Sequence, residues 1–239
     1  MSEHNITVEG GTSVLLPTAG KYCDRNIIIT AMGGGSSDSD VEKYFEAQHA
    51  EVVLPNVESI KPCAFYKDTT MTQITMPKVK SIDVEAFSHC QNLALTSLPS
   101  NLTSIGEYAF NNCTKLALTS LPSGITELGK NTFYKCTNLA LTSLPSGITE
   151  IGNAVFFGCT NLALTSLPSG ITSIGLNAFY NCKNLSSLTF KGTPTSIANN
   201  AFDSCTNLLT INVPWAEGAV ANAPWGATKA TINYNYTGE

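Results

Sequence analysis

Residues 104–126 read SIGEYAFNNCTKLALTSLPSGIT, and close variants of this unit of 23 residues fill most of the chain. Two columns of apolar residues keep the same step. The cysteine column contains Cys90, Cys113, Cys136, Cys159, Cys182 and Cys205. The phenylalanine column contains Phe87, Phe110, Phe133, Phe156, Phe179 and Phe202. The string Leu-Ala-Leu-Thr-Ser-Leu-Pro-Ser begins at Leu93, Leu116, Leu139 and Leu162. Self-similarity at one fixed period is the signature of a repeat architecture.

Each unit predicts a short helical turn followed by an extended segment. Ala109, Phe110 and Cys113 fall at i, i+1 and i+4, which is one face of a helical turn. Residues 116–121 are leucine-rich and too short for a helix, so we expect a strand there. Pro122 terminates this strand because proline cannot donate to a sheet ladder. The Ser-Gly pair that follows predicts a turn.

A unit of this length cannot bury its own apolar face, whereas stacked units can, because like side chains then lie on one another. Neighbouring strands ~4.8 Å apart would form a parallel ladder along the stack. The predicted fold class is therefore an α/β repeat solenoid with a parallel β ladder and short helical turns. The residues that we assign to its core are Phe110, Phe133, Phe156, Phe179, Cys113, Cys136, Cys159 and Cys182.

The pattern Ile-Gly-x-x-Ala-Phe-x-x-Cys-x-x-Leu, followed by Leu-Pro and Ile-Thr-x-Ile, resembles the BspA-like class of bacterial leucine-rich repeats. The resemblance covers residues 53–214. It implies a right-handed leucine-rich-repeat superhelix that serves protein–protein or cell-surface contact in adhesion or recognition. It supplies no catalytic residue, so we expect no enzyme activity.

The central repeats depart from the family strand, which reads Leu-x-x-Ile-x-Ile-Pro. Residues 185–190 and 208–214 follow that pattern, but the four central units read Leu-Ala-Leu-Thr-Ser-Leu-Pro. This difference moves one apolar side chain by one residue, and a shift of one residue changes the face to which a strand side chain points. We therefore expect a bulge or bend in the central strands.

The flanking segments differ in composition from the repeats. Residues 5–8 and 26–30 predict strands, and the glycine- and serine-rich stretch after them predicts a linker. Asp40 is a candidate N-cap, and Trp215 and Trp225 predict a hydrophobic lid. The expected parts are a small β-rich N-terminal module (1–31), a flexible linker (32–40), an N-terminal capping helix (41–52), the leucine-rich repeats (53–214) and a C-terminal cap (215–239).

Composition excludes several classes of partner. A net charge of −5 argues against nucleic acid, which favours a basic protein face. No apolar run approaches the ~18–20 residues of a membrane span, and the N-terminus lacks the pattern of a signal peptide. We therefore expect neither nucleic-acid binding nor membrane insertion.

The cysteine column allows three interpretations. Metal binding is disfavoured because the column has no Cys-x-x-Cys spacing and no nearby histidine set. Disulfides between adjacent coils have a suitable Cα separation, but side chains stacked in one column point in parallel and do not converge. The favoured interpretation is a small buried hydrophobe. We expect no metal and no cofactor.

Two surfaces are candidate binding sites. Tyr134, Phe157 and Tyr180 follow the buried phenylalanines in adjacent coils and predict an aromatic stripe on the outer surface. Alternatively, these rings pack sideways on one another and on lysine side chains. The second surface is a Ser/Thr face of the predicted strands, which suits a glycan or a protein but equally suits a solvated surface. Its residues are Thr96, Ser97, Thr119, Ser120, Thr142, Ser143, Thr165 and Ser166.

These observations predict a non-catalytic scaffold that binds an unidentified protein or cell-surface ligand. The expected location is the cell surface or the extracellular space. An alternative follows from residues 11–30, which are similar to short modules in tail-associated proteins of phages from Gram-positive gut bacteria. That alternative is a structural or receptor-facing part of a phage or prophage tail, located on the particle.

Overall fold

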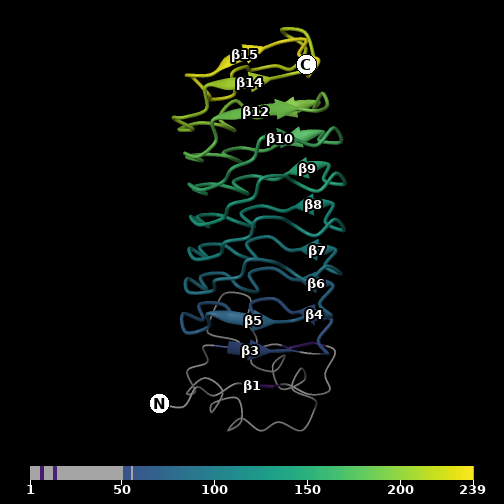
Figure 1. Ribbon diagram of the computed structural model, residues 1–239, viewed down its shortest axis with the longest axis vertical. Helices are drawn as coiled ribbons and strands as arrows, with labels where there is room; N and C mark the ends of the chain where they lie inside the picture. The colour runs from purple at the N-terminus through teal and green to yellow at the C-terminus, as the bar shows by residue number, and fades with distance from the viewer. Residues whose placement is uncertain (1–5, 8–12, 15–50, 55, 239) are drawn as a thin grey trace.

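The computed structural model describes residues 6–7, 13–14, 51–54 and 56–238, which form a stack of coils (Figure 1). The predicted strand at 26–30, the linker at 32–40 and residues 41–50 of the predicted capping helix lie outside the described residues. Most of the segment that resembles phage-tail modules lies outside them too. Residues 51 and 52, which we had placed at the end of the helix, belong to a strand.

Short strands line the stack. They are β1 (Ile6–Thr7), β2 (Ser13–Val14), β3 (Glu51–Val53), β4 (Ser59–Ile60), β5 (Gln73–Thr75), β6 (Ser81–Ile82), β7 (Ser104–Ile105), β8 (Glu127–Leu128), β9 (Glu150–Ile151), β10 (Ser166–Leu167), β11 (Ser173–Ile174), β12 (Ser187–Phe190), β13 (Ser196–Ile197), β14 (Thr210–Asn212) and β15 (Thr231–Asn233). All their pairings are parallel. The predicted parallel ladder is confirmed.

The strands form two faces of the solenoid. One face, which we call the Ser-Ile face, carries the sheets β2-β4-β6-β7 and β13-β11-β9-β8. The other, which we call the strand face, carries β1-β3-β5 and β10-β12-β14-β15, with a gap between β5 and β10. Ser81 pairs with Ser104 and Glu127 with Glu150. Each coil therefore corresponds to one repeat of the sequence.

The segment predicted as a helical turn is a run of β-turns, and no α-helix occurs among the residues that the structure describes. The N–H groups of Ala109, Asn111 and Cys113 each donate to the carbonyl three residues earlier, at 3.0–3.3 Å. Tyr108 and Asn112 have φ values of 56° and 59°. A positive φ interrupts a right-handed helix, so the helical spacing of the apolar residues arises from successive turns. We call this side the turn face.

The phenylalanine column forms the centre of the core. Adjacent rings stack with centroids 5.0–5.9 Å apart. The separation is 5.1 Å between Phe65 and Phe87, 5.9 Å between Phe133 and Phe156, and 5.0 Å at the last pair.

The cysteine column does more than fill space. Each Sγ from Cys90 to Cys205 lies 2.8–3.1 Å from the carbonyl of a phenylalanine in the preceding coil, as Cys136 does with Phe110 at 2.9 Å. A thiol is a weak donor. The Phe110 carbonyl also accepts the backbone N–H of Cys113 at 3.1 Å. Cysteine therefore combines the volume of a small apolar residue with a hydrogen bond that joins adjacent coils.

The strand face bends in three of the four central repeats, as the sequence predicts, whereas the fourth contains the strand β10. The chain bends at Thr96, Thr119 and Thr142, and residues 116–121 do not form the expected strand. In these repeats the buried leucines follow spacings of two and then three, as at Leu118 and Leu121. A regular strand repeats with period two, so the backbone must bend for both leucines to point inward.

The C-terminal cap closes the last coil with two tryptophans. Trp225 is fully buried, and its indole Nε1 donates to Ala221 O at 2.7 Å. Trp215 is also buried, with its ring centroid 5.2 Å from that of Phe190. Phe202 N–H donates to Trp225 O, so the cap continues the backbone ladder of the phenylalanine column.

Candidate interaction surface

The turn face places Tyr134, Phe157 and Tyr180, which we call the aromatic stripe. Each residue follows a buried phenylalanine, and its N–H donates to the carbonyl three residues earlier at 3.0–3.3 Å. The carbonyls of Phe157 and Tyr180 accept N–H groups from the preceding coil at 2.6 and 2.7 Å. These short bonds between coils hold successive rings in register.

The three rings stack face to face. The ring centroids of Tyr134 and Phe157 are 4.7 Å apart, with planes inclined by 16°. Those of Phe157 and Tyr180 are 4.4 Å apart, with planes inclined by 11°. All three residues are half-buried. Because these rings cover both faces of Phe157 and one face of each tyrosine, the ring edges and the two tyrosine hydroxyls remain for contact with solvent or a partner.

Lysines border the aromatic side chains of the turn face. Lys135 Nζ lies 5.3 Å from the centroid of Tyr134, and Lys130 Nζ lies 5.7 Å from that of Tyr108. Both distances fall within the range of a cation–π contact. Sequence reasoning expected both lysines beside the stripe, but Lys130 contacts Tyr108 in the preceding coil. Of these two lysines, only Lys135 therefore adds a positive charge to the stripe, at its Tyr134 end, although the chain as a whole is acidic.

The Ser/Thr face is not the flat sheet that the sequence predicts. Only Ser166, at the start of β10, belongs to a strand, and the other hydroxyl residues lie in bent segments. Thr142 N–H lies 3.4 Å from Thr119 O, and Thr165 N–H lies 3.5 Å from Thr142 O. These bonds are long for backbone hydrogen bonds. All of these residues except the half-buried Ser166 are exposed, but they follow an irregular surface.

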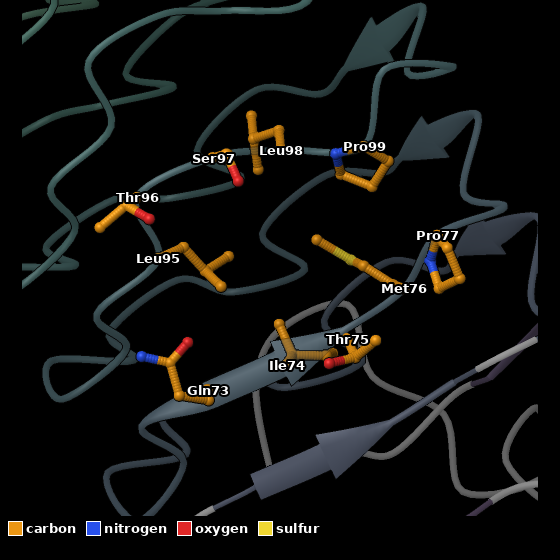
Figure 2. A pocket seen from close by; sticks show the side chains of 10 residues that line it. All are labelled: Gln73, Ile74, Thr75, Met76, Pro77, Leu95, Thr96, Ser97, Leu98 and Pro99. Atoms are coloured by element: carbon orange, nitrogen blue, oxygen red, sulfur yellow. The ribbon is translucent and has the colours of Figure 1, made fainter.

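Hollows open where neighbouring coils are not joined by strands. A hollow of about 280 Å³ lies between β5 and residues 95–99 (Figure 2). In Figure 2, Ile74, Met76 and Leu95 project toward the space between the two segments. The described backbone hydrogen bonds include none from Thr96 to Ile74. A second hollow of about 430 Å³ separates β7 from β8, which belong to different sheets.

The fully buried thiols in the centre of the cysteine column are poorly suited to nucleophilic catalysis. Burial raises the pKa of the Cys113, Cys136 and Cys159 thiols well above their ordinary value. The reactive thiolate is therefore suppressed. Burial, together with Lys67, lowers the pKa of His89. No cluster of three or more potential metal-ligating side chains occurs among the described residues.

Sequence reasoning missed two features of these surfaces. The bonds between cysteine and phenylalanine carbonyls require the backbone of the adjacent coil, which the sequence does not show. The hollows likewise depend on where backbone pairing between the strand segments of neighbouring coils is absent. The turns of the turn face did have a signal in the sequence. Gly158 occupies the position of Asn112 and Lys135, and a column rich in Asn and Gly indicates a positive φ.

The stacked parallel coils define a leucine-rich-repeat solenoid. The family model described as the BspA type leucine rich repeat region matches residues 43–162 and 127–218, in six copies. The chain belongs to this family of bacterial leucine-rich-repeat proteins. None of the curated proteins matches the chain.

Solved structures include several similar proteins. A leucine-rich repeat protein of T. pallidum is 27% identical, with a TM-score of 0.47 over 70% of this chain and 73% of that one. One from Bacteroides ovatus is 19% identical, with a TM-score of 0.45 over 78% of this chain and 61% of that one. A leucine-rich cell surface protein of Faecalibacterium prausnitzii is 19% identical, with a TM-score of 0.34 over 97% and 90%.

The part of the chain that the structure describes contains no helix with the length and apolarity needed to cross a bilayer.

Proposed function

We propose that the chain is a non-catalytic scaffold that binds a protein partner through the aromatic stripe of the turn face. The observation that carries this proposal is the stack of Tyr134, Phe157 and Tyr180, held half-exposed by backbone bonds between coils. Rigid aromatic side chains lose little conformational entropy on binding, and they are enriched among residues that dominate interface energies.

The geometry of the stack favours a protein partner over a sugar ring. A flat ligand that stacks on an aromatic platform needs an open ring face, and neighbouring rings cover the faces within the stripe. The exposed ring edges carry partial positive charge, the tyrosine hydroxyls donate and accept, and Lys135 adds a cation. Carbonyl and carboxylate oxygens of a protein surface complement this arrangement.

Location on a cell surface is part of the same proposal. The family is bacterial, and one of the similar structures is named as a cell surface protein. A scaffold of stacked coils presents a long side surface, and repeat proteins use such surfaces for binding. The partner is then a protein exposed on a neighbouring cell or in the surrounding matrix.

The test compares two triple variants in binding to intact cells. Tyr134→Ser/Phe157→Ser/Tyr180→Ser removes the stripe, and Thr96→Ala/Thr119→Ala/Thr142→Ala is the matched change on the Ser/Thr face. We expect the labelled wild-type protein to bind cells, protease treatment of the cells to abolish binding, and only the first variant to lose it. Equal binding by the wild-type protein and the first variant would refute the proposal.

A further inference from the structure

The last strand of the strand face leaves one edge open. β15 ends the sheet β10-β12-β14-β15, so no described strand pairs with its outer side (Figure 1). Thr231 N–H donates to Leu209 O, and Asn233 O accepts from Val213 N, both toward the preceding coil. Alternate residues of a strand bond to opposite neighbours. The N–H and C=O of Ile232 therefore point out of the sheet.

The side chains along this edge form two unfinished columns. Toward the core, Leu188 pairs in register with Ile211, and Ile211 pairs with Ile232. The first two are fully buried, but Ile232 is only half-buried because the column ends there. An edge strand of this kind is a template for another chain, and natural edges often carry a lysine, a proline or a bulge. β15 contains no lysine or proline, and it is three residues long.

The outward column is a ladder of amides and hydroxyls. Asn212 Nδ2 donates to Thr189 Oγ1 at 3.1 Å, and Asn233 Nδ2 donates to Asn212 Oδ1 at 2.8 Å. Asn233 is exposed, as is Thr231 two residues earlier on the same side of the strand. The ladder therefore ends at the amide of Asn233, which has no counterpart in a further described coil. Beside it lies the hydroxyl of Thr231, the kind of group to which Asn212 donates within the ladder.

We infer that β15 pairs with β15 of a second copy of this chain in an antiparallel arrangement with a twofold axis at Ile232. Each Ile232 N–H then donates to the Ile232 C=O of the other copy. The same arrangement places Thr231 opposite Asn233 of the second copy on both sides of the axis. The Asn233 amide can then bond the Thr231 hydroxyl of the other copy, as Asn212 bonds Thr189 within the ladder, and the two Ile232 side chains cover each other.

This occupant follows from the self-complementarity of the edge. The backbone of Ile232 supplies one donor and one acceptor, and its two neighbours carry a hydroxyl and an amide. A twofold axis at Ile232 therefore places each donor opposite an acceptor of the other copy. A twofold contact is isologous and closed, so it yields a dimer and not a polymer. The dimer brings two solenoids end to end and doubles the number of aromatic stripes.

The experiment measures the oligomeric state of the full chain by sedimentation velocity between about 1 and 100 µM, a range that resolves micromolar dissociation constants. Thr231→Lys/Asn233→Lys places like charges opposite each other twice across the axis. Thr231→Lys/Asn233→Glu places opposite charges there. We expect the wild-type chain and the second variant to dimerise, and the first variant to dissociate at least tenfold more readily. Cross-strand charge pairs act in these directions.

Two proline variants separate the loss of pairing from the loss of folding. Ile232→Pro removes an N–H that points away from β14, so it should abolish the dimer with the thermal transition largely unchanged. Thr231→Pro removes an N–H that bonds Leu209 O and should destabilise the cap. A monomeric wild-type chain at 100 µM, or equal association of the two charge variants, would overturn the inference. Species larger than a dimer would also overturn it, since they indicate head-to-tail stacking of β15 on β1.

Discussion

The turn face and the strand face belong to the same coils, yet only the turn face is uniform along the central repeats. On the turn face, Lys135 N–H lies 2.6 Å from Phe157 O in the next coil. On the strand face, seven residues later, Thr142 N–H lies 3.4 Å from Thr119 O in the preceding coil. The two faces share one core, so packing alone does not explain the difference.

The difference shows that local apolar spacing, together with the regularity of the adjacent strand, governs the hydrogen bonds between coils on the strand face. Ala109, Phe110 and Cys113 suit a run of turns in every repeat, because turns with positive φ accept many spacings. A strand accepts only period two. Where the spacing becomes regular, at Leu188 and Phe190 in β12, the bond from Thr189 N–H to Thr165 O shortens to 3.0 Å.

Alkaline pH should weaken the turn side of the coils most. Burial raises the pKa of Cys90, Cys113, Cys136 and Cys159 well above 9.0, whereas the unfolded chain ionises near that value. The native state then holds protons that the unfolded state has lost, so this stability is complete below pH 9 and falls as pH rises. At pH 10 each thiol that stays protonated in the native state should cost on the order of 1 kcal/mol, so the four together should give the largest loss of stability.

Urea unfolding between pH 8 and 10.5 measures this loss of stability. The control is Cys136→Ala, which should lower the dependence on pH by about 1.4 kcal/mol per pH unit. A thiol reagent should leave the cysteine column unmodified in the native protein at pH 8 and modify it after unfolding. Rapid native labelling of Cys136 would contradict the burial on which the prediction rests.

Removal of one ring from the shared core should affect both faces. Phe156 is fully buried, so Phe156→Ala should lower the free energy of unfolding by about 3–5 kcal/mol. Its neighbour Phe157 is half-buried on the turn face, so Phe157→Ala is the matched control and should cost less than half as much. Denaturant titration measures both. Equal losses would mean that the two rings are equally buried.

A swap of two residues should lengthen the regular sheet by restoring period two. In Leu164→Ser/Thr165→Leu the inward residues become 165 and 167, in line with Leu188 and Phe190 of β12. We expect β10 to begin at residue 164 or 165, and the amide at 165 to exchange at least about tenfold more slowly, since exchange follows local opening. The reverse exchange in β12, Ser187→Leu/Leu188→Thr, should shorten that strand. An unchanged exchange rate in the first variant would disprove the spacing argument.

The smallest effect needs no mutation. Native-state hydrogen exchange should show the Lys135 amide more protected than the Thr142 amide of the same coil, because the bond between coils at Lys135 is shorter. Thr189 on the regular strand face should resemble Lys135. If Thr142 and Thr189 exchange at the same rate, the bend at Thr142 does not weaken the strand face.

Much of the fold could be predicted because the repeat constrains it from many positions at once. The step of 23 residues predicts parallel coils, and the register of Ser81 with Ser104 agrees with it. The helical turn was wrong because spacing alone does not distinguish a helix from turns: Ala109 and Phe110 point inward in both. The positive φ at Tyr108 decides between them, and tyrosine gives no signal for it.

The candidate surfaces were less accessible to sequence reasoning. The sequence places Tyr134, Phe157 and Tyr180 in one column, but their stacking depends on backbone bonds that bring the coils together. The open edge at Ile232 is visible only after the partners of Thr231 and Asn233 are known. Exposure and pairing are properties of neighbours in space, so residue types alone do not predict them.

The amino-acid sequence by itself determined the length of each coil, the residues that form its columns and the irregular apolar spacing of the central repeats. Tertiary structure alone decided which copies of an identical segment become strands. Leu-Ala-Leu-Thr-Ser-Leu-Pro occurs in four coils, yet only the last copy contains a strand, β10. That copy lies beside β12, whose regular backbone pairs Thr189 with Ser166. A strand needs a neighbour that offers its hydrogen bonds in register, and the same residues without that neighbour bend.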